Sequence, residues 1–313
     1  MKWKNFLKMK DDFEKYLQVL GHSATTIHGH LSALRYLATW AEKENLEVCQ
    51  ISYTELLSFT KHCQNKGASK PTVNKYLRSV KHYFNHLIEQ GSAKENPAQY
   101  LQLKGIPRNK LYDIFTPLEL ESIYNRFFNK DFTSKRYGTL KKVHELEHLR
   151  NKVIVGMLVY QGLRSDEIIH LRTEDVKLRK GMIEVPEIKN GNAREMKLEA
   201  CQIMELHQYM TEGRKEILAI TNQQTEKLFI NTGTGPNLHN TLHKLAQQLS
   251  AVEPRAKNLK QLRASVITKW LKLYNLRQVQ YLAGHKWISS TEEYLQNEME
   301  GLQEEINRYH PLG

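Results

Sequence analysis

The sequence predicts a mainly α-helical protein with a small β-sheet, divided into a helical N-terminal domain and an α+β second domain. A length of 313 residues is enough for two cores of ordinary size. Apolar residues recur at helical spacing through 1–104 and most of 116–313, with a short basic linker at 105–115. Only around 182–198 does the pattern become strand-like, on both sides of a Lys-Asn-Gly-Asn turn, which predicts a hairpin.

Residues 1–104 are expected to form helices only. One helix is expected to follow the segment HSATT at 22–26, with Ser23 or Thr25 as a possible N-cap. A second is expected to follow SYTELL at 52–57, and a third covers about 72–90. The apolar stripe of the first of these helices consists of Ile27, Leu31, Leu34, Leu37 and Trp40.

The third helix has two distinct faces. At about 100° per residue, one broad arc holds the apolar residues Val73, Tyr76, Leu77, Val80, Tyr83, Phe84, Leu87 and Ile88. The neighbouring arc carries Lys75, Arg78, Lys81 and His82. One face is therefore expected to pack, and the positive face beside it is a candidate DNA-binding surface; an ordinary solvated helix face is the simpler alternative.

The second domain is expected to open on a helix, because Thr116-Pro117-Leu118-Glu119 combines a capping box with proline at the first helical position. Residues 129–142 are expected to form a basic loop, and 296–313 a tail. The predicted helices cover 117–129, 143–161, 200–219, 238–251, 258–274 and 276–283, and the predicted strands 182–185, 195–198 and 227–232.

The charge balance favours a polyanionic partner. Lys and Arg total 46 against 34 Asp and Glu, which gives a net charge of +12. Residues 1–105 hold 15 basic and nine acidic side chains, so half of the excess lies in each domain. A basic surface spread over two domains suits a protein that lies along nucleic acid.

Several other classes are disfavoured. The three cysteines, Cys49, Cys63 and Cys201, form no CxxC pair and imply no disulfide framework. No apolar run approaches the ~18 residues of a membrane span, and the charged start is no secretory signal, so a soluble cytoplasmic protein is expected. Neither an HExxH motif nor a recognisable set of acidic metal ligands is present, so we expect no metal and no cofactor.

Five residues in order along the chain point to phosphoryl transfer without a metal. They are Arg164, Lys189, Arg263, His285 and Tyr294. A tyrosine hydroxyl, with an ordinary pKa of about 10, can attack a phosphodiester if its proton is removed. Two guanidinium groups can hold the non-bridging oxygens, a lysine can protonate the departing sugar oxygen, and a histidine can donate to the phosphate or shuttle the proton.

The segments around these residues closely resemble the tyrosine recombinase (phage integrase) family over the whole chain. GLRSDEIIHL and QLRAS resemble its two arginine boxes, IKNGNAR its lysine hairpin, and LAGHKWISSTEEYL its third box with the nucleophile. The resemblance implies that residues 1–104 are the core-type DNA-binding domain and 116–313 the catalytic domain. It also implies catalytic roles for Arg164, Lys189, Arg263, His285 and Tyr294, with Glu167 bracing the site.

One position departs from the family. A histidine is common three residues before the second arginine, and this chain has Lys260. A lysine can donate to a phosphate oxygen but accepts a proton poorly at neutral pH, and related type IB topoisomerases lack that histidine. Lys260 is therefore expected to contact phosphate; a weakened enzyme or an ordinary surface lysine are the alternatives. Rival residues stay open: Lys180, Arg194 and Lys197 for the general acid, and Tyr281 and Tyr309 for the nucleophile.

The expected function is site-specific recombination of the integrase or invertase type, through a covalent 3′-phosphotyrosine and without metal or ATP. The partners would be double-stranded DNA and further copies of the chain, as a dimer on a site and a tetramer in the synapse. Because such tails dock on a neighbouring protomer in the family, the resemblance implies the same for the tail at 296–313; a helix folded on its own domain is the alternative. A type IB topoisomerase-like relaxing enzyme and a non-catalytic DNA-binding protein on the same fold are the alternatives.

Overall fold

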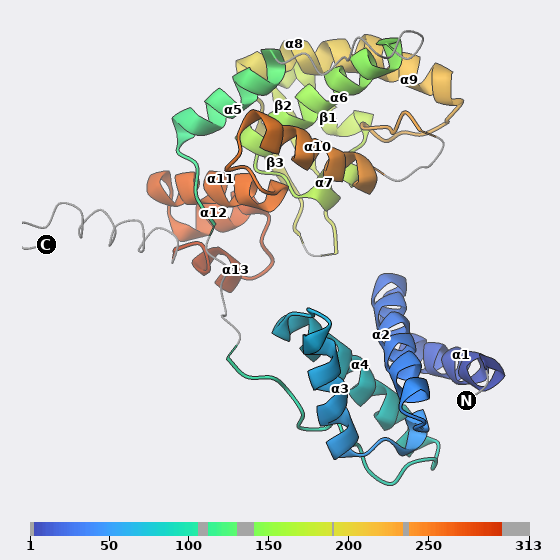
Figure 1. Cartoon of the computed structure of the whole chain (residues 1–313). Coiled ribbons are helices and arrows are strands. Elements are labelled where there is room, and N and C mark those ends of the chain that lie inside the picture. Colours follow the sequence, from blue (N-terminus) through green and yellow to red (C-terminus); the bar gives the residue numbers. More distant parts are fainter. Residues whose placement is uncertain (1–2, 106–111, 130–140, 190, 234–237, 296–313) are drawn as a thin grey trace, which may run out of the picture. The chain divides into compact units, whose positions relative to one another are not determined.

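The chain divides into two compact units, Met1–Arg108 (unit 1) and Asn109–Gly313 (unit 2), each with its own core (Figure 1). The tail at 296–313 and nearly all of the predicted loop at 129–142 lie outside the described residues. The computed structural model describes residues 3–105, 112–129, 141–189, 191–233 and 238–295.

Unit 1 is helical, as predicted. Ser23 caps the second helix, because its Oγ accepts from the Thr26 amide at 3.3 Å. Ser52 and Glu55 form a capping box at the third helix. The elements are α1 (Trp3–Val19), α2 (Ala24–Lys43), the 3₁₀ turn η1 (Val48–Gln50), α3 (Tyr53–Asn65) and α4 (Lys70–Glu89).

Helix α4 has the predicted apolar face. It contacts α1, α2 and α3, and the ring of Tyr83, 1% exposed, meets that of Phe13 edge-on at 5.5 Å. Ile88, in the last turn, departs from the prediction because it is 38% exposed. On the neighbouring face Lys75 and Arg78 are exposed.

Unit 2 combines helices with a three-stranded antiparallel sheet, which confirms the predicted fold class and hairpin. The strands are β1 (Val176–Lys177), β2 (Met182–Val185) and β3 (Arg194–Lys197), in the order β1-β2-β3. The short turns are η3 (Thr173–Asp175), η4 (Leu178–Lys180) and the π-helical η5 (Tyr209–Gly213). The helices are α5 (Pro117–Asn129), α6 (Lys141–Tyr160), α7 (Ser165–His170), α8 (Ala200–Gln208), α9 (Arg214–Thr221), α10 (His239–Val252), α11 (Leu259–Leu273), α12 (Leu276–Ala283) and α13 (Ser289–Glu292).

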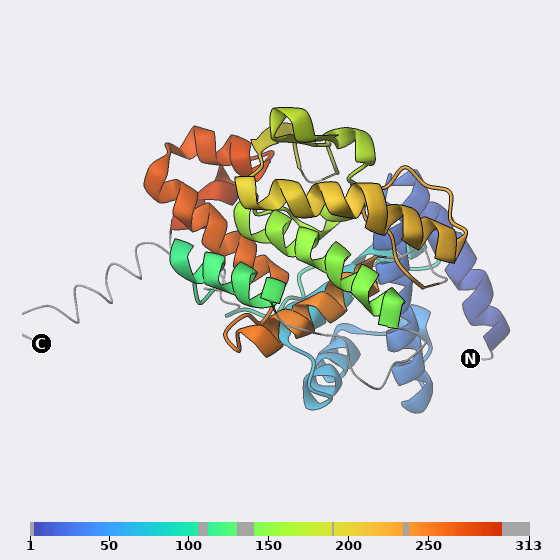
Figure 2. The same ribbon diagram turned by 90° about the horizontal axis from the view of Figure 1, so that it is seen from above.

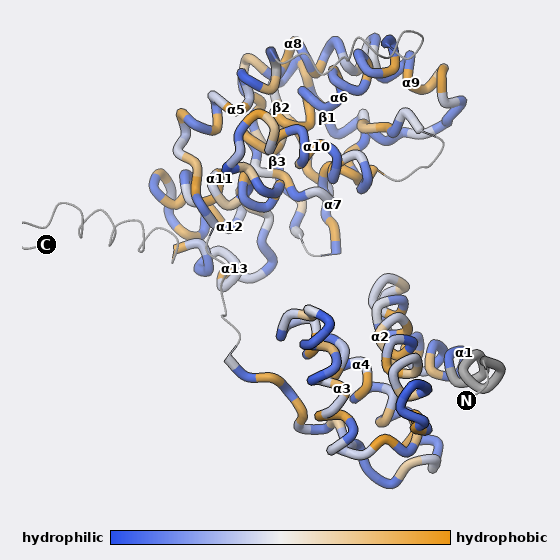
Figure 3. The backbone as a smooth tube through the Cα atoms, in the orientation of Figure 1, coloured by the Kyte–Doolittle hydropathy of each residue, from blue (hydrophilic) through white to orange (hydrophobic). Residues whose placement is uncertain are grey.

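Helix α6 lies at the centre of unit 2. It contacts α5, α8, α9 and α11, and Figure 2 shows α8 and α9 running alongside it. Because neighbours cover α6 from several sides, all residues from 153 to 159 are buried. Helices covered on one side only alternate between hydrophobic and hydrophilic residues along their length (Figure 3). No helix in the described ranges combines the length and apolar character needed to cross a bilayer.

The start of unit 2 is anchored on α11. The Thr116 amide donates to the Glu119 carboxylate at 2.7 Å, and the Glu119 amide donates to Thr116 Oγ1 at 3.3 Å, which confirms the predicted capping box. Just before it, Phe115 is buried and its amide donates to Ser265 Oγ at 3.0 Å. This anchor brings the chain past the N-terminal end of α11, which carries Arg263.

The predicted strand at 227–232 is wrong. Only an isolated bridge between Lys227 and Arg172 forms there. Side chains take up the neighbouring carbonyl groups instead: Tyr209 Oη donates to Leu228 O at 3.0 Å, and Arg150 Nη1 to Ile230 O at 2.9 Å. Residues 228–230 are buried as a strand would be, but the segment pairs with the main chain only beside Arg172, where the Leu228 amide donates to Leu171 O at 2.8 Å.

Candidate active site

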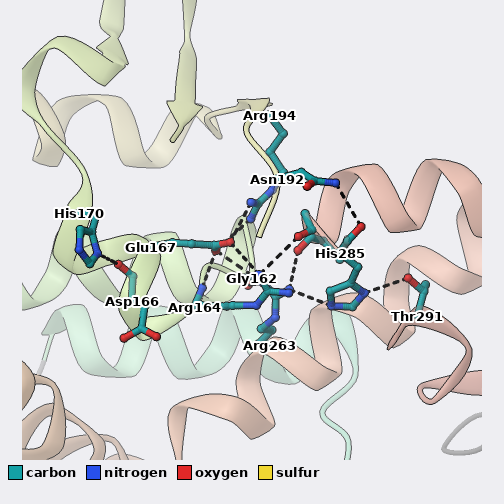
Figure 4. Close-up of polar contacts among 12 residues, drawn as sticks. Gly162, Arg164, Asp166, Glu167, His170, Asn192, Arg194, Arg263, His285 and Thr291 are labelled. Atoms are coloured by element: carbon teal, nitrogen blue, oxygen red, sulfur yellow. Dashed lines mark hydrogen bonds and ion pairs between the residues drawn. The ribbon is translucent and has the colours of Figure 1, made fainter. Parts of the chain in front are cut away.

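The carboxylate of Glu167 is the centre of the site. It lies on α7, fully buried, and accepts from the amide of Arg164 at 2.8 Å, which closes the first turn of that helix. Both of its oxygens are also held by Arg194 on β3, at 2.9 and 3.1 Å. Figure 4 shows this carboxylate between Arg194 and Arg164.

The three guanidinium groups around Glu167 keep it ionised. Burial on its own would raise the pKa of Glu167, but the hydrogen bonds and charge of Arg194 and the charge of Arg263 lower that pKa below its usual value. The Arg263 Nη1 atom lies 3.7 Å and the Arg164 Nη1 atom 3.4 Å from the carboxylate. A single buried anion thus offsets part of the repulsion among three cations.

Arg263, on α11, is almost fully buried, and backbone carbonyl groups fix its position. Nη1 donates to Gly162 O and Nη2 to Ala283 O, each at 2.6 Å. These bonds join the turn before α7 to the end of α12. Burial, together with the positive charge of Arg164, lowers the pKa of Arg263 to about 10, so the group is still a cation at neutral pH.

His285, just after α12, is buried as a neutral imidazole. Its Nε2 lies 3.1 Å from Arg263 Nη2 and its Nδ1 2.9 Å from Thr291 Oγ1 (Figure 4). Since a guanidinium only donates, Nε2 accepts, and Nδ1 carries the proton and donates to Thr291. Burial, followed by the charge of Arg263, lowers the pKa of His285 to about 3.

Tyr294 completes a pocket of about 400 Å³ on the surface of unit 2. Its half-buried ring stacks on His285, with centroids 5.8 Å apart and planes 16° from parallel. Arg164 and Arg263 line the same pocket, and the exposed Lys260, one turn before Arg263 on α11, lies at its edge. The pocket therefore places the Tyr294 hydroxyl with three cationic side chains, and Tyr112, Ser165 and Asp166 complete its polar lining.

Lys189 lies in the exposed turn between β2 and β3 and is not among the residues that line this pocket. The far side of the same turn is nevertheless tied to the site. The Asn192 amide donates to Gly284 O at 3.1 Å, and a Cβ added to Gly191 would lie 2.5 Å from Arg164 Nη1. The hairpin that carries Lys189 is thus packed against the arginine.

The structure also separates the rival residues. Arg194 is buried and doubly bonded to Glu167, so it has a bracing position, whereas Lys180 and Lys197 are exposed. Tyr281 is exposed, and its Oη accepts from the Glu195 amide at 3.2 Å. Tyr309 lies outside the described residues.

Two contributors to the site were not predicted from the sequence. The bracing role of Arg194 and the Thr291 contact of His285 depend on pairs 27 and six residues apart. For Arg194 the only local indication was an arginine at an inward-facing position of a strand, because a buried arginine needs an anionic partner. Nothing in the sequence around Thr291 indicated its contact with His285.

A family model described as the phage integrase family matches residues 130–300. A second, described as the phage integrase N-terminal SAM-like domain, matches 11–91. Among curated proteins, tyrosine recombinase XerC of Oceanobacillus iheyensis is 25% identical, with 96% of this chain and 95% of the relative covered. Tyrosine recombinase XerD of Listeria monocytogenes is 24% identical, with coverage of 97% and 99%.

Solved structures with the same fold include XerH recombinase bound to a palindromic difH substrate in a post-cleavage complex. That likeness has a TM-score of 0.68 at 19% identity and covers 89% of this chain and 78% of the other. The Tn1549 transposon integrase with transposon right-end DNA gives a TM-score of 0.62 at 17% identity, covering 96% and 99%.

A helical unit followed by an α+β unit, whose pocket holds a tyrosine beside two arginines, defines the class of tyrosine recombinases. Both family models together span most of the described residues. The chain belongs to the phage integrase family.

Proposed function

We propose that this chain is a site-specific DNA recombinase that cleaves and rejoins DNA with Tyr294 as its nucleophile. The observation that carries the proposal is the shared pocket, in which the tyrosine lies with Arg164, Arg263 and Lys260. A hydroxyl beside three cations is suited to attack on a phosphodiester, whose negative charge grows in the transition state.

The arginines bind the scissile phosphate in this proposal. Burial lowers the pKa of both Arg164 and Arg263. The charge of Arg194 lowers the pKa of Arg164 further, and the charge of Arg164 does the same to Arg263. A phosphodiester anion in the pocket would relieve this repulsion. Because Glu167 and two backbone carbonyl groups already hold the guanidinium groups, little reorganisation is needed when DNA arrives.

Bond making and breaking follow from this placement. Tyr294 Oη forms a bond to phosphorus, the bond from phosphorus to the 5′ oxygen breaks, and a 3′-phosphotyrosine results. Lys189 protonates the departing 5′ oxygen. The phenolic proton passes to Nε2 of His285, whose ring stacks on that of Tyr294. In the free protein this nitrogen accepts from Arg263, so it becomes available when the Arg263 guanidinium turns to the entering phosphate.

Rejoining reverses the same steps. The phosphotyrosine bond conserves the free energy of the phosphodiester, so a 5′ hydroxyl of another strand can attack it without ATP. Lys260 adds a phosphate contact at the edge of the pocket. No step requires a metal ion or an organic cofactor.

In unit 1, the face of α4 with Lys75, Arg78, Lys81 and His82 would contact the DNA backbone, where each cation near a phosphate releases counterions. We propose that the chain binds a site as a dimer and forms a tetramer in the synapse. A solved relative, the lambda integrase, is described as a tetramer bound to a Holliday junction. The site of action would be the cytoplasm, where the target DNA lies.

The decisive experiment traps the covalent intermediate on a nicked suicide substrate carrying the chain's own target site. Wild-type protein should give a protein–DNA adduct, and Tyr294→Phe should give none. Tyr281→Phe is the matched control, because it removes an exposed tyrosine hydroxyl outside the pocket and should leave the adduct intact. Absence of an adduct with wild type would favour a non-catalytic DNA-binding protein, and an adduct with Tyr294→Phe would exclude Tyr294.

A further inference from the structure

Three histidines of unit 1 lie side by side, outside the pocket of unit 2; one of them, His82, also belongs to the proposed DNA-binding face of α4. His22 is in the turn between α1 and α2, His30 is on α2 and His82 is on α4. Their ring centroids are 5.0 to 5.4 Å apart, and one nitrogen of each ring lies within 4.8 Å of those of the other two. His22 and His30 are eight residues apart in the chain, and His30 and His82 are 52 apart, so the sequence spacing did not predict the cluster.

The hydrogen bonds around His30 determine which of its nitrogens carries the proton. The Ser79 hydroxyl has one hydrogen, which it donates to the Lys75 carbonyl oxygen at 3.1 Å. His30 Nδ1, 2.8 Å from Ser79 Oγ, is therefore the donor in that contact, and Nε2 keeps a lone pair. A second hydrogen bond that orients the ring in this way is typical of histidines that bind metal ions.

The burial of the three rings also suits a metal site. His30 is 8% exposed, whereas His22 and His82 are half-buried, so an ion can reach the cluster from solvent. The neutral imidazole is the form that binds a metal.

We propose that His22, His30 and His82 together bind one divalent transition-metal ion, with Zn²⁺ as the best-fitting ion. Zinc prefers imidazole nitrogens and four-coordination, so three histidines leave one position for water. Bonds of about 2.0–2.1 Å would place the nitrogens roughly 3.3 Å apart, so the rings must close slightly. His22 lies in a turn and can make this adjustment with its side chain.

The ion would act as a structural crosslink in unit 1. It would tie the α1–α2 turn and α2 to α4, the helix that carries the positive face. The charges of Lys75 and Arg78 act on His30 and oppose a dication, so we expect them to weaken its binding. The proposal does not depend on the proposed catalysis.

The test is a zinc titration of the full chain by isothermal calorimetry. Wild type should bind one more equivalent of Zn²⁺ than either His22→Gln or His82→Gln. His28→Gln is the matched control, because His28 is exposed on α2 two residues from His30 and lies outside the cluster. Ser79→Ala should keep the site but weaken it by roughly 10–100-fold, since it removes only the group that orients His30.

Co²⁺ provides a second readout that general destabilisation would not imitate. Wild type should show the strong visible absorption of a four-coordinate ion, and the His22→Gln and His82→Gln proteins, checked to be folded by circular dichroism, should lack it. Because an ion that binds only the folded state stabilises it, zinc should also raise the unfolding midpoint of wild type and His28→Gln, but not that of His22→Gln or His82→Gln. Equal zinc stoichiometry in wild type and both glutamine variants would overturn the proposal, and so would an equal loss in His28→Gln.

Discussion

Glu167 shows how one residue can organise several others. Its buried carboxylate holds Arg194 through two bonds, closes the first turn of α7 and lies within 3.7 Å of Arg263. Its bracing role was implied by resemblance, but its partner on β3 could not be read from the sequence. Glu167 lies three residues after Arg164 in the same sequence motif, so its role could be predicted. Its contact with Arg194 depends on how the sheet packs against α7.

We predict that Glu167→Gln destabilises the protein and slows DNA cleavage. Breaking one partner of a buried ion pair typically costs about 3–5 kcal/mol, because the other charge is left buried. Urea unfolding and suicide-substrate cleavage measure the two effects. Glu174→Gln is the control, since the Glu174–Arg172 pair is exposed and should contribute less than about 1 kcal/mol. Equal effects of the two substitutions would contradict the central role of Glu167.

We predict that Lys260→Ala slows cleavage without loss of stability. Lys260 is exposed and lines the pocket, and a hydrogen bond to a charged group is worth about 1.5–3 kcal/mol, or roughly ten- to a hundredfold in rate. The rate of adduct formation and the unfolding midpoint are the measurements. Lys257→Ala, at another exposed lysine that does not line the pocket, is the control. A wild-type rate would remove Lys260 from the active site.

Among the elements, the end of α12 places the tightest constraint on the site. Gly284 has φ of +60°, and its carbonyl oxygen accepts from the Asn192 amide. A Cβ at this position would lie 2.4 Å from Arg194 Nη1, which Glu167 holds in place. The GHK segment was recognised for its histidine, but the need for glycine before it depends on a strand 90 residues earlier.

Gly284→Ala should therefore lower both stability and cleavage rate. The left-handed backbone alone costs an L-residue about 1–2 kcal/mol, and the displacement of Arg194 adds to this. Gly181→Ala separates the two causes, because Gly181 has φ of +63° but its nearest neighbouring atom is 4.0 Å from the added Cβ. Chemical denaturation and cleavage assays should show a larger loss of stability and of cleavage rate for Gly284→Ala than for Gly181→Ala. Equal losses would mean that backbone strain alone explains the effect, and that Arg194 is not displaced.

The element predictions succeeded where the signal was local. The capping box at Thr116, the Ser23 cap and the β2–β3 hairpin are each specified within a few residues. The strand predicted at 227–232 does not form, although the segment has a β-type composition, because it pairs with the rest of the chain only through an isolated bridge. Arg150 and Tyr209 donate to two of its carbonyl groups instead. Helix α1 was not delimited, since charged residues interrupt its apolar pattern.

At the scale of the whole molecule, two separate cores each carry a cluster of buried or half-buried titratable groups. The motif residues Arg164, Arg263, His285 and Tyr294 were predicted, and they meet in one site in unit 2. The histidine cluster of unit 1 was not predicted. Its members lie on three elements, and only packing brings them together.

Stability should fall as the pH is lowered from about 6.5 towards 3. The unfolded chain binds a proton at His285 near pH 6.5, but the folded chain does so only near its pKa of about 3, so acid favours unfolding. Between pH 7 and 5 this group contributes on the order of 2 kcal/mol. Urea unfolding of wild type and His285→Gln at both pH values measures it. The variant should lose less stability on acidification, and an equal loss would contradict a neutral buried His285.

The sharing of Glu167 among three arginines also limits how such a protein can diversify. Substitutions at positions 164, 167, 194 and 263 will not combine additively, because each changes the electrostatic environment of the others. A mutant library that varies these positions one at a time would sample mostly inactive proteins. Selection for new target sites should therefore accumulate substitutions at other positions. The four residues around the shared carboxylate should either stay unchanged or change together.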